Sequence, residues 1–231
     1  MIKLLDHGYL KLIRVWGDDR EIIEDARMSV DASFVSWEPY DKHPKGDLGL
    51  LTRLWTSRHT SPFEGSGLKF EIQCPILVAR EWMRHRTQSY SEFSARYAAL
   101  PDRFYIPSIE RIMAGKQSQK NKQGSEEGFS KAEAASLQID MVEAIHKSRE
   151  VYEKLLKEGI SRELARCIVP VCQYTRFRTS ANLHNWLHFL RLRLDAGAQW
   201  EIRQYAEALS VVVAEKFPKT YELFSESLNN E

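Results

Sequence analysis

Residues 84–97 read RHRTQSYSEFSARY and place three arginines, a histidine, a glutamate and several hydroxyl side chains directly after an apolar, helix-like run. Arginine presents a planar fork of N–H donors that matches phosphate oxygens, while serine hydroxyls and backbone amides add uncharged donors. The stretch therefore predicts a site for a ligand that carries phosphate. The alternative for residues 84–86 is a charged helix terminus, because the carbonyl dipole at a helix C-terminus favours cations.

The overall composition limits what surrounds this stretch. The chain has 231 residues, 43% of them hydrophobic, so it can bury one sizeable core. Its formal net charge is +1, so the whole-molecule field would not gather duplex nucleic acid or an anionic membrane, and any positive site must be local. No apolar run approaches the ~20 residues of a membrane span, which predicts a cytosolic, cytoplasmic protein.

Cysteine usage points to the same compartment. The three cysteines, Cys74, Cys167 and Cys172, lack CxxC spacing and have apolar neighbours in the sequence. This pattern indicates reduced structural thiols in a reducing compartment. No metal site is expected.

Hydrophobic periodicity predicts the order of the elements. In residues 1–16, apolar and polar side chains alternate in short runs on either side of a turn at Gly8, which predicts a strand or hairpin. Residues 68–74 show the same alternation and predict another strand. Pro75 suits the first turn of a helix that delivers Arg84 at its end. Apolar residues at three-and-four spacing predict helices over 19–26, 48–58, 131–158, 162–171, 182–195 and 199–216.

The polar stretch 114–130 divides the chain. It cannot bury enough apolar area to order itself, so it predicts a flexible insertion between a mixed first half and a second half that is all helix. We therefore expect one α+β domain over residues 1–231, a mixed helix-and-sheet fold with a helical second half. The pattern SYSE at 89–92 fits a helix capping box, and a turn there would hold the charged residues of 84–96 around a short loop.

An ordered series of short motifs adds a family resemblance. The triplet RHR at 84–86 is followed by Ser94 and then by Arg96-Tyr97. With this spacing the chain resembles the flavin-dependent thymidylate synthases, the ThyX family. The resemblance extends over nearly the whole chain through blocks at 26–29, 59–64, 104–107, 162–166, 169–170, 174–175, 182–185, 188–190, 192–193 and 198–201.

The resemblance implies a ThyX-like homotetramer with FAD and dUMP in clefts built by several subunits. In the implied reaction NADPH reduces FAD, 5,10-methylenetetrahydrofolate supplies the one-carbon unit and dUMP becomes dTMP. The residues that the resemblance places around FAD are Ser61, Glu64, Arg84, His85, Arg86, Glu92, Asn182, His184 and His188. Around dUMP it places Glu81 and Arg84 from a neighbouring chain, together with Glu92, Phe93, Ser94, Ala95, Arg96, Arg166 and Arg193.

The chemistry of Arg193 can be stated from its side chain. To attack a one-carbon electrophile through C5, uracil must gain electron density, and a permanently charged guanidinium at O2 and N3 stabilises the anion left when N3 loses its proton. Arg193 is therefore the candidate catalytic residue, in place of a cysteine nucleophile. The alternative is an arginine on a helix surface within residues 191–193.

Other candidates have simpler roles. Arg166 has apolar neighbours, among which an unpaired charge would be costly, and a bound phosphate would compensate it. Ser94 has no adjacent base to activate it, so a hydrogen-bond donor is expected and not a nucleophile. His59 and His85 are expected to position ligands, with proton transfer as the alternative.

Five positions depart from the commoner family pattern, in segments expected to border flavin, folate or pyrimidine. They are Gly65, Glu81, Ser91, Thr179 and Gly197. A smaller side chain there admits a different substrate pose or an extra water. Two variant reactions therefore stay open beside ordinary dUMP methylation: formation of a 5-hydroxymethyl pyrimidine nucleotide, and action on dCMP.

Two readings from other classes compete. A helical nucleic-acid-binding module would use Arg84, Arg86, Arg96, Arg176 and Arg178 against phosphates, but such binders normally carry a basic excess, which this chain lacks. A structural oligomerisation domain explains the apolar helices equally well. It leaves the dense hallmark stretch unexplained.

Overall fold

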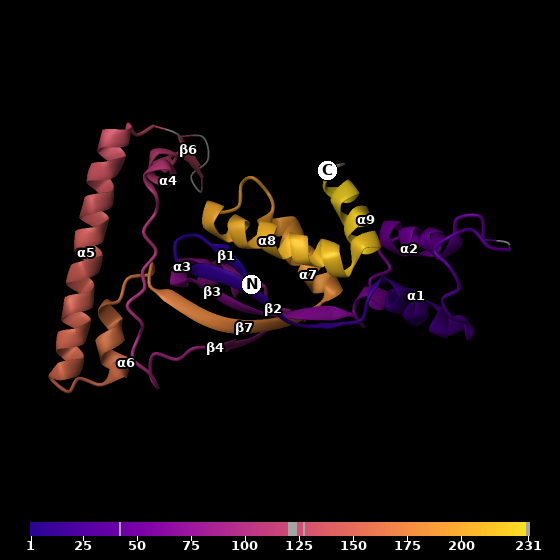
Figure 1. The fold of residues 1–231 in the computed structure, drawn as a ribbon, viewed down its shortest axis with the longest axis horizontal. Coiled ribbons are helices and arrows are strands. Elements are labelled where there is room, and N and C mark those ends of the chain that lie inside the picture. The colour runs from indigo at the N-terminus through magenta and orange to yellow at the C-terminus, as the bar shows by residue number, and fades with distance from the viewer. Residues whose placement is uncertain (42, 120–123, 127, 230–231) are drawn as a thin grey trace.

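The structure is a computed structural model that describes residues 1–41, 43–119, 124–126 and 128–229 (Figure 1). Its strands are β1 (Ile2–Leu4), β2 (Gly8–Trp16), β3 (Gly67–Pro75), β4 (Ser89–Glu92), β5 (Lys116–Gln117), β6 (Ser125–Glu126) and β7 (Tyr174–Asn182). Its α-helices are α1 (Asp19–Arg27), α2 (Gly46–Thr56), α3 (Ile76–Trp82), α4 (Ile109–Met113), α5 (Lys131–Lys157), α6 (Arg162–Ala165), α7 (Leu183–Arg193), α8 (Trp200–Lys216) and α9 (Pro218–Asn229). Its short 3-10 helices are η1 (Met28–Val30), η2 (Ser61–Phe63) and η3 (Arg166–Ile168).

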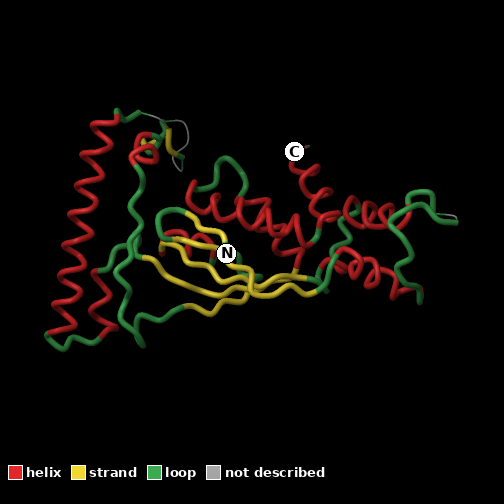
Figure 2. Tube along the Cα trace, in the orientation of Figure 1, coloured by secondary structure: helices red, strands yellow, loops and turns green. Residues whose placement is uncertain are grey.

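Five strands form one antiparallel sheet in the order β1-β2-β3-β7-β4 (Figure 2). In the register of β3 and β7, Ile72 lies opposite Phe177 and Glu71 lies opposite Arg178. Successive side chains of a strand point to opposite faces, so the first pair enters the core and the second pair shares the other face. The mixed α+β fold class expected from the sequence is confirmed.

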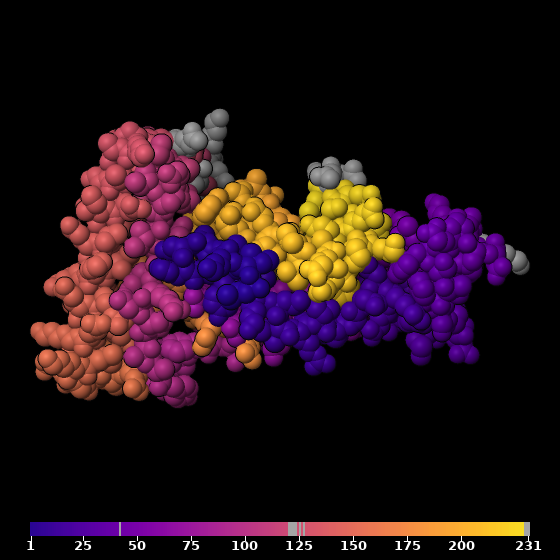
Figure 3. Space-filling model, in the orientation of Figure 1, coloured from indigo at the N-terminus to yellow at the C-terminus, as the bar shows by residue number. Residues whose placement is uncertain are grey.

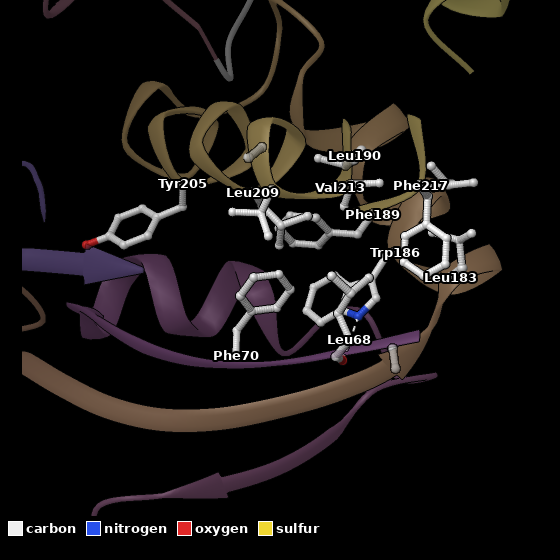
Figure 4. Packing of buried hydrophobic residues seen from close by; sticks show 14 of the residues in the cluster. Leu68, Phe70, Leu183, Trp186, Phe189, Leu190, Tyr205, Leu209, Val213 and Phe217 are labelled. Carbon is white, nitrogen blue, oxygen red and sulfur yellow. Dashed lines mark hydrogen bonds between the residues drawn. The ribbon is translucent and has the colours of Figure 1, made fainter. Parts of the chain in front are cut away.

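Helices α7 and α8 cover the apolar face of the sheet (Figure 4). Trp186 of α7 is fully buried and donates its indole N–H to the carbonyl of Leu68 at 3.0 Å. Tyr205 of α8 donates its hydroxyl to the carbonyl of Gln73 at 2.7 Å. A Cβ at Gly8 would overlap that hydroxyl, so glycine is required where α8 approaches the sheet. Burying each large side chain in this core stabilises the fold by about 2 kcal/mol.

The molecule is extended at both ends of the sheet (Figure 3). Helices α4, α5 and α6 form one end, and α1 and α2 form the other, where α9 packs against both. Asp19 ties the second end together, because its carboxylate accepts hydrogen bonds from the backbone amides of Lys219 at 2.8 Å and Thr220 at 3.1 Å. The Thr220 hydroxyl donates to the same carboxylate at 2.6 Å. Asp19 therefore caps the start of α9.

Most of the expected elements are present. The hairpin in residues 1–16 is confirmed as β1 and β2, although Gly8 begins β2 and does not form the turn. The helices expected over 19–26, 48–58, 131–158, 182–195 and 199–216 are confirmed to within about two residues at each end. Helices α4 and α9 were not expected.

Three expectations about local structure are wrong. The second half is not all helix, because β7 lies in it, with Phe177 and Thr179 buried and Arg176 and Arg178 exposed in alternation. Residues 162–171 form only the short α6 and η3, not one helix. Residues 89–92 do not start a helix, because their backbone pairs with β7 at the edge of the sheet.

The cysteines differ in exposure. Cys74 is buried, as expected for a structural thiol, whereas Cys172 is half-buried and Cys167 is exposed. The apolar sequence neighbours of Cys167 do not bury it, because the short η3 turns its side chain outward. All three thiols are free.

The polar stretch 114–130 is described only in part. Residues 120–123 and 127 lie outside the described residues. On either side of them, β5 pairs with β6 so that Lys116 lies opposite Glu126. Ser130 then begins α5 through a capping box with Glu133. The flexibility of this insertion and the single-domain organisation stay predictions.

Candidate active site

The arginine-rich stretch begins where α3 ends. The apolar side of α3, which includes Trp82, is buried, and the backbone amide of His85 donates to the carbonyl of Trp82 at 3.0 Å. This turn buries His85, which is 7% exposed, and leaves Arg84 and Arg86 exposed. The triplet therefore presents two cations to a ligand and one histidine to the protein interior.

Arg193, at the end of α7, contacts the segment from α3. Its Nε donates a hydrogen bond to Nε2 of His85 at 2.9 Å. Its Nη1 forms an ion pair with Oε2 of Glu81 at 2.9 Å, and its Nη2 donates to the Glu81 carbonyl at 3.4 Å. The Arg193 side chain is 17% exposed and that of Glu81 is 42% exposed. The guanidinium is thus held by two residues and is still reachable by a ligand.

His85 is neutral in this contact, because a ring nitrogen that accepts a hydrogen bond from arginine carries no proton. Burial, the positive charge of Arg193 and the neighbouring His188 together lower the pKa of His85 to about 4. The ring packs edge-on against Phe189, with 4.7 Å between the ring centroids. The proton of the neutral imidazole therefore lies on Nδ1.

A cavity of about 570 Å³ opens between α2, α7 and α9. Its wall combines imidazoles, apolar rings and two arginine side chains. The lining residues are Thr52, Leu54, Trp55, Thr56, Arg58, His59, Thr60, Phe63, His184, Leu187, His188, Arg191, Leu223, Glu226 and Ser227. Two of the residues expected around FAD, His184 and His188, thus line it together with His59. Apolar walls with a few placed polar groups are typical of sites for cofactors.

Three other residues expected around FAD lie on the elements that form this cavity. Ser61 begins η2 and Glu64 directly follows it. Both are exposed, and the Glu64 carboxylate accepts a hydrogen bond from the Thr60 hydroxyl at 3.3 Å. Asn182 caps α7, because its side-chain oxygen accepts from the backbone amide of Asn185 at 2.9 Å. The structure brings these residues to one region.

The residues at the end of β4 and directly after it form a second group. Glu92 accepts a hydrogen bond from the Thr175 hydroxyl at 2.6 Å. The Ser94 hydroxyl accepts from the Arg96 backbone amide at 3.3 Å, and the Arg96 side chain pairs with Glu163 of α6 at 3.0 Å. Between them a small separate core contains Phe93, Ala95, Leu100, Tyr152, Leu155, Leu156, Ala165 and Val169.

Arg166 is exposed at the start of η3, so the burial expected from its apolar neighbours is wrong. The reason is that α6 and η3 bury Ala165 but leave Leu164 and Ile168 61% and 39% exposed. Arg166 and Arg96 lie at the α6 end of the molecule, whereas Arg193 and the cavity lie at α7 (Figure 1). Within one chain, the expected site residues therefore form two separate groups.

The departures from the family pattern have specific surroundings. The Thr179 hydroxyl donates to Oε1 of Gln88 at 2.8 Å, and the same oxygen accepts from the indole of Trp82 at 3.1 Å. This buried bridge lies directly after the arginine triplet. Ser91 is exposed on β4, and the Gly197 amide donates to the Asp195 carboxylate at 2.7 Å.

Sequence reasoning missed part of the cavity wall. Trp55, Arg58 and Leu223 belong to no motif, and only the folded arrangement of α2, α7 and α9 brings them together. Arg191 belongs to the segment 191–193 but faces the cavity, whereas Arg193 contacts His85. Two helical arginines two residues apart point in different directions.

Within the part of the chain that the structure describes, no three His, Cys, Asp or Glu side chains gather into a group that could hold a metal ion. None of the described helices has both the length and the apolar content needed to cross a membrane.

Known proteins resemble this chain in sequence and in structure. The family model "Thymidylate synthase complementing protein" matches residues 11–219. Flavin-dependent thymidylate synthases of Thermus thermophilus and Dictyostelium discoideum are 42% and 39% identical, over 98% and 96% of this chain and 79% and 73% of their own lengths.

Solved structures of related proteins share the fold of this chain. The UMP/dUMP methylase PolB from Streptomyces cacaoi, bound with 5-Br UMP, superposes with a TM-score of 0.83 at 30% identity, over 98% of this chain and 97% of its own. Its crystal structure bound with 5-Br dUMP gives a TM-score of 0.84, also at 30% identity, over 97% of each chain. The family model and these relatives cover nearly every element described above, and they show that the chain belongs to the thymidylate synthase complementing protein family, the flavin-dependent thymidylate synthases.

Proposed function

We propose that this chain catalyses the reductive methylation of dUMP to dTMP, with FAD as cofactor and with NADPH and 5,10-methylenetetrahydrofolate as co-substrates. Family membership and the names of the relatives support the reaction class. The observation that carries the proposal in this structure is the largely buried Arg193, held by Glu81 and His85 close to an imidazole-lined cavity.

The cavity between α2, α7 and α9 fits FAD. Trp55 and Phe63 supply apolar surface for a flat ring, and Arg58 and Arg191 supply positive charge for phosphates. FAD, when bound, supplies the hydride chemistry of the reaction. The protein residues that we propose in contact with it are Ser61, Glu64, Arg84, Arg86, Glu92, Asn182, His184 and His188, whereas the buried His85 supports the site through Arg193.

Arg193 acts on the pyrimidine. Its positive charge stabilises the uracil anion that forms when N3 loses its proton, and this raises the electron density at C5. The charge acts strongly because the side chain is 17% exposed and little water screens it. The N–H groups of Nη1 and Nη2 that point away from Glu81 are the donors for O2 and N3.

The nucleotide site is completed by a second subunit. Glu81, Arg84 and Arg193 form one group, whereas Arg96, which pairs with Glu163 of α6, and Arg166 of η3 belong to the α6 end of the molecule. Because the resemblance places both groups around one nucleotide, we propose a homotetramer with sites shared between subunits. The second group, which contacts deoxyribose and phosphate, consists of Glu92, Phe93, Ser94, Ala95, Arg96 and Arg166.

Exposed apolar side chains support assembly at the α6 end. Leu164 is 61% exposed and Val171 is 55% exposed on the segment that carries Arg166. Covering them with another copy removes apolar surface from water. A cytoplasmic location is also proposed, because three free thiols are typical of a reducing compartment.

The test is to incubate the purified protein with methylenetetrahydrofolate, NADPH and either dUMP, UMP or dCMP, and to identify the product by mass spectrometry. We expect a yellow protein that forms dTMP from dUMP. The Arg193→Ala variant should lose turnover while it keeps its flavin. The control variant Arg53→Ala, which removes an exposed arginine from α2, should keep its turnover. A hydroxymethyl product, or activity on dCMP alone, would contradict the proposed reaction, and turnover by Arg193→Ala would contradict the proposed role.

A further inference from the structure

The environment of His85 differs from that of the arginines beside it. Its ring is 7% exposed, and its Nε2 accepts the Nε–H of Arg193 at 2.9 Å. The exposed Arg84 and Arg86 can reach a ligand, but Nε2 of His85 is occupied by the protein itself. A role through Arg193 therefore explains the histidine better than a direct contact with a ligand.

We propose that His85 is a positioning residue for Arg193, whose Nε–H it accepts so that the guanidinium plane is fixed toward the pyrimidine. This inference rests on the proposed function, in which Arg193 contacts uracil. A guanidinium has one plane and one set of N–H directions, so fixing Nε also fixes the directions in which Nη1 and Nη2 donate.

The His85 ring is itself held firmly. Its edge packs on Phe189 with 4.7 Å between the centroids, and the Tyr90 hydroxyl donates to the His85 carbonyl at 2.9 Å. The single proton of this hydroxyl is shared with the Trp82 carbonyl at 3.0 Å, which connects the turn to the end of α3. Because ring and backbone are both fixed, the acceptor atom has a defined place. A free arginine side chain samples many rotamers, and such an acceptor restricts them before substrate binds.

A neutral acceptor suits this task better than a second carboxylate. A carboxylate would orient the guanidinium but would also cancel the charge that stabilises the uracil anion. Glu81 already supplies one carboxylate at 2.9 Å, and with 42% of its side chain exposed its charge is partly screened by water. His85 fixes the remaining direction without adding negative charge.

Two substitutions at His85 separate positioning from packing. His85→Phe keeps an aromatic ring against Phe189 but removes the acceptor, whereas His85→Gln offers an amide oxygen near the place of Nε2. We expect His85→Phe to lower kcat about 100-fold, because misplacing a catalytic group by ~1 Å has that effect. The KM for dUMP and the Kd for FAD should change by less than about threefold, and His85→Gln should recover kcat to within about tenfold of wild type.

The control is His146→Gln, which removes an exposed imidazole from α5 and should behave as wild type. The proposal is overturned if His85→Phe keeps wild-type kcat, or if it weakens FAD binding while kcat at saturating FAD is unchanged. Failure of the proposed function gives a different result, namely no dTMP from the wild type or full turnover by Arg193→Ala.

A measurement on the wild type tests the hydrogen bond between Arg193 and His85 even if the His85→Phe variant does not fold. Nitrogen NMR of histidine-labelled protein with bound FAD should show Nε2 of His85 without a proton and Nδ1 with one at neutral pH. A proton on Nε2 excludes the hydrogen bond from Arg193 and overturns the proposal.

Discussion

Acidification should destabilise this protein through His85. Burial, the positive charge of Arg193 and the neighbouring His188 lower the pKa of the folded ring from 6.5 to about 4. As pH falls below 6.5, the unfolded chain binds a proton at this histidine while the folded chain does not, so unfolding becomes more favourable. The contribution of the neutral ring is complete above pH 6.5 and is lost as pH falls toward 4.

The size of the effect follows from the two pKa values. Each unit of difference corresponds to about 1.36 kcal/mol, so a shift from 6.5 to about 4 amounts to about 3 kcal/mol in total. By pH 5 about 2 kcal/mol is lost, because the unfolded histidine is almost fully protonated there and the folded one is still mostly neutral. This is a large part of the stability of an ordinary domain.

Urea unfolding at pH 7.5 and pH 5 measures this loss, at one protein concentration because assembly also stabilises the folded state. The wild type should lose about 2 kcal/mol more than His85→Gln between the two pH values. His146→Gln, which lacks an exposed histidine instead, should lose as much as the wild type. Equal losses in wild type and His85→Gln would refute the reasoning.

Three further substitutions test other parts of the structure. Asp19→Ala removes three hydrogen bonds at the start of α9 and should lower the free energy of unfolding in urea by about 3 kcal/mol. Asp18→Ala removes only the exposed cap of α1 and should lower it by about 1 kcal/mol, so equal losses would contradict this prediction. Glu81→Gln removes a negative charge 2.9 Å from Arg193 and should lower the KM for dUMP about threefold in steady-state kinetics, so a higher KM would speak against the ion pair. Trp186→Phe removes the indole N–H bond to the Leu68 carbonyl and leaves a gap in the core, so it should lower the unfolding free energy by about 2 kcal/mol. An unchanged urea midpoint would argue against that bond.

Sequence patterns predicted the elements whose hydrophobic residues repeat with a clear period. The strand at 68–74 alternates strictly, and α5 carries both helical spacing and a capping box at Ser130. β7 was missed because Thr179 and its polar neighbours carry little hydrophobic signal, and they are buried only because β3 and β4 lie on both sides. The prediction of a helix start at residues 89–92 was wrong for the same reason, because an edge strand forms only where a distant strand pairs with its backbone.

The candidate site divides along the same line. The family recognition is confirmed, and motif order alone carried it. The contacts of Arg193 with Glu81 and His85 join residues more than 100 positions apart, and no spacing rule predicts which nitrogen meets which acceptor. The exposure of Arg166 was also beyond sequence reasoning, because apolar neighbours on a short helix need not bury it.

The place of β7 has a consequence for synthesis on the ribosome. β3 and β4 are consecutive strands, yet β7 lies between them in the sheet, and α5 and α6 are made before it. A nascent chain that has emerged only through α6 has no partner for the inner edge of β4, and α7, which carries Arg193, is not yet made. Late insertion of a central strand is slow and leaves strand edges open to wrong partners. We therefore expect newly made chains to depend on chaperones until the last third has left the exit tunnel.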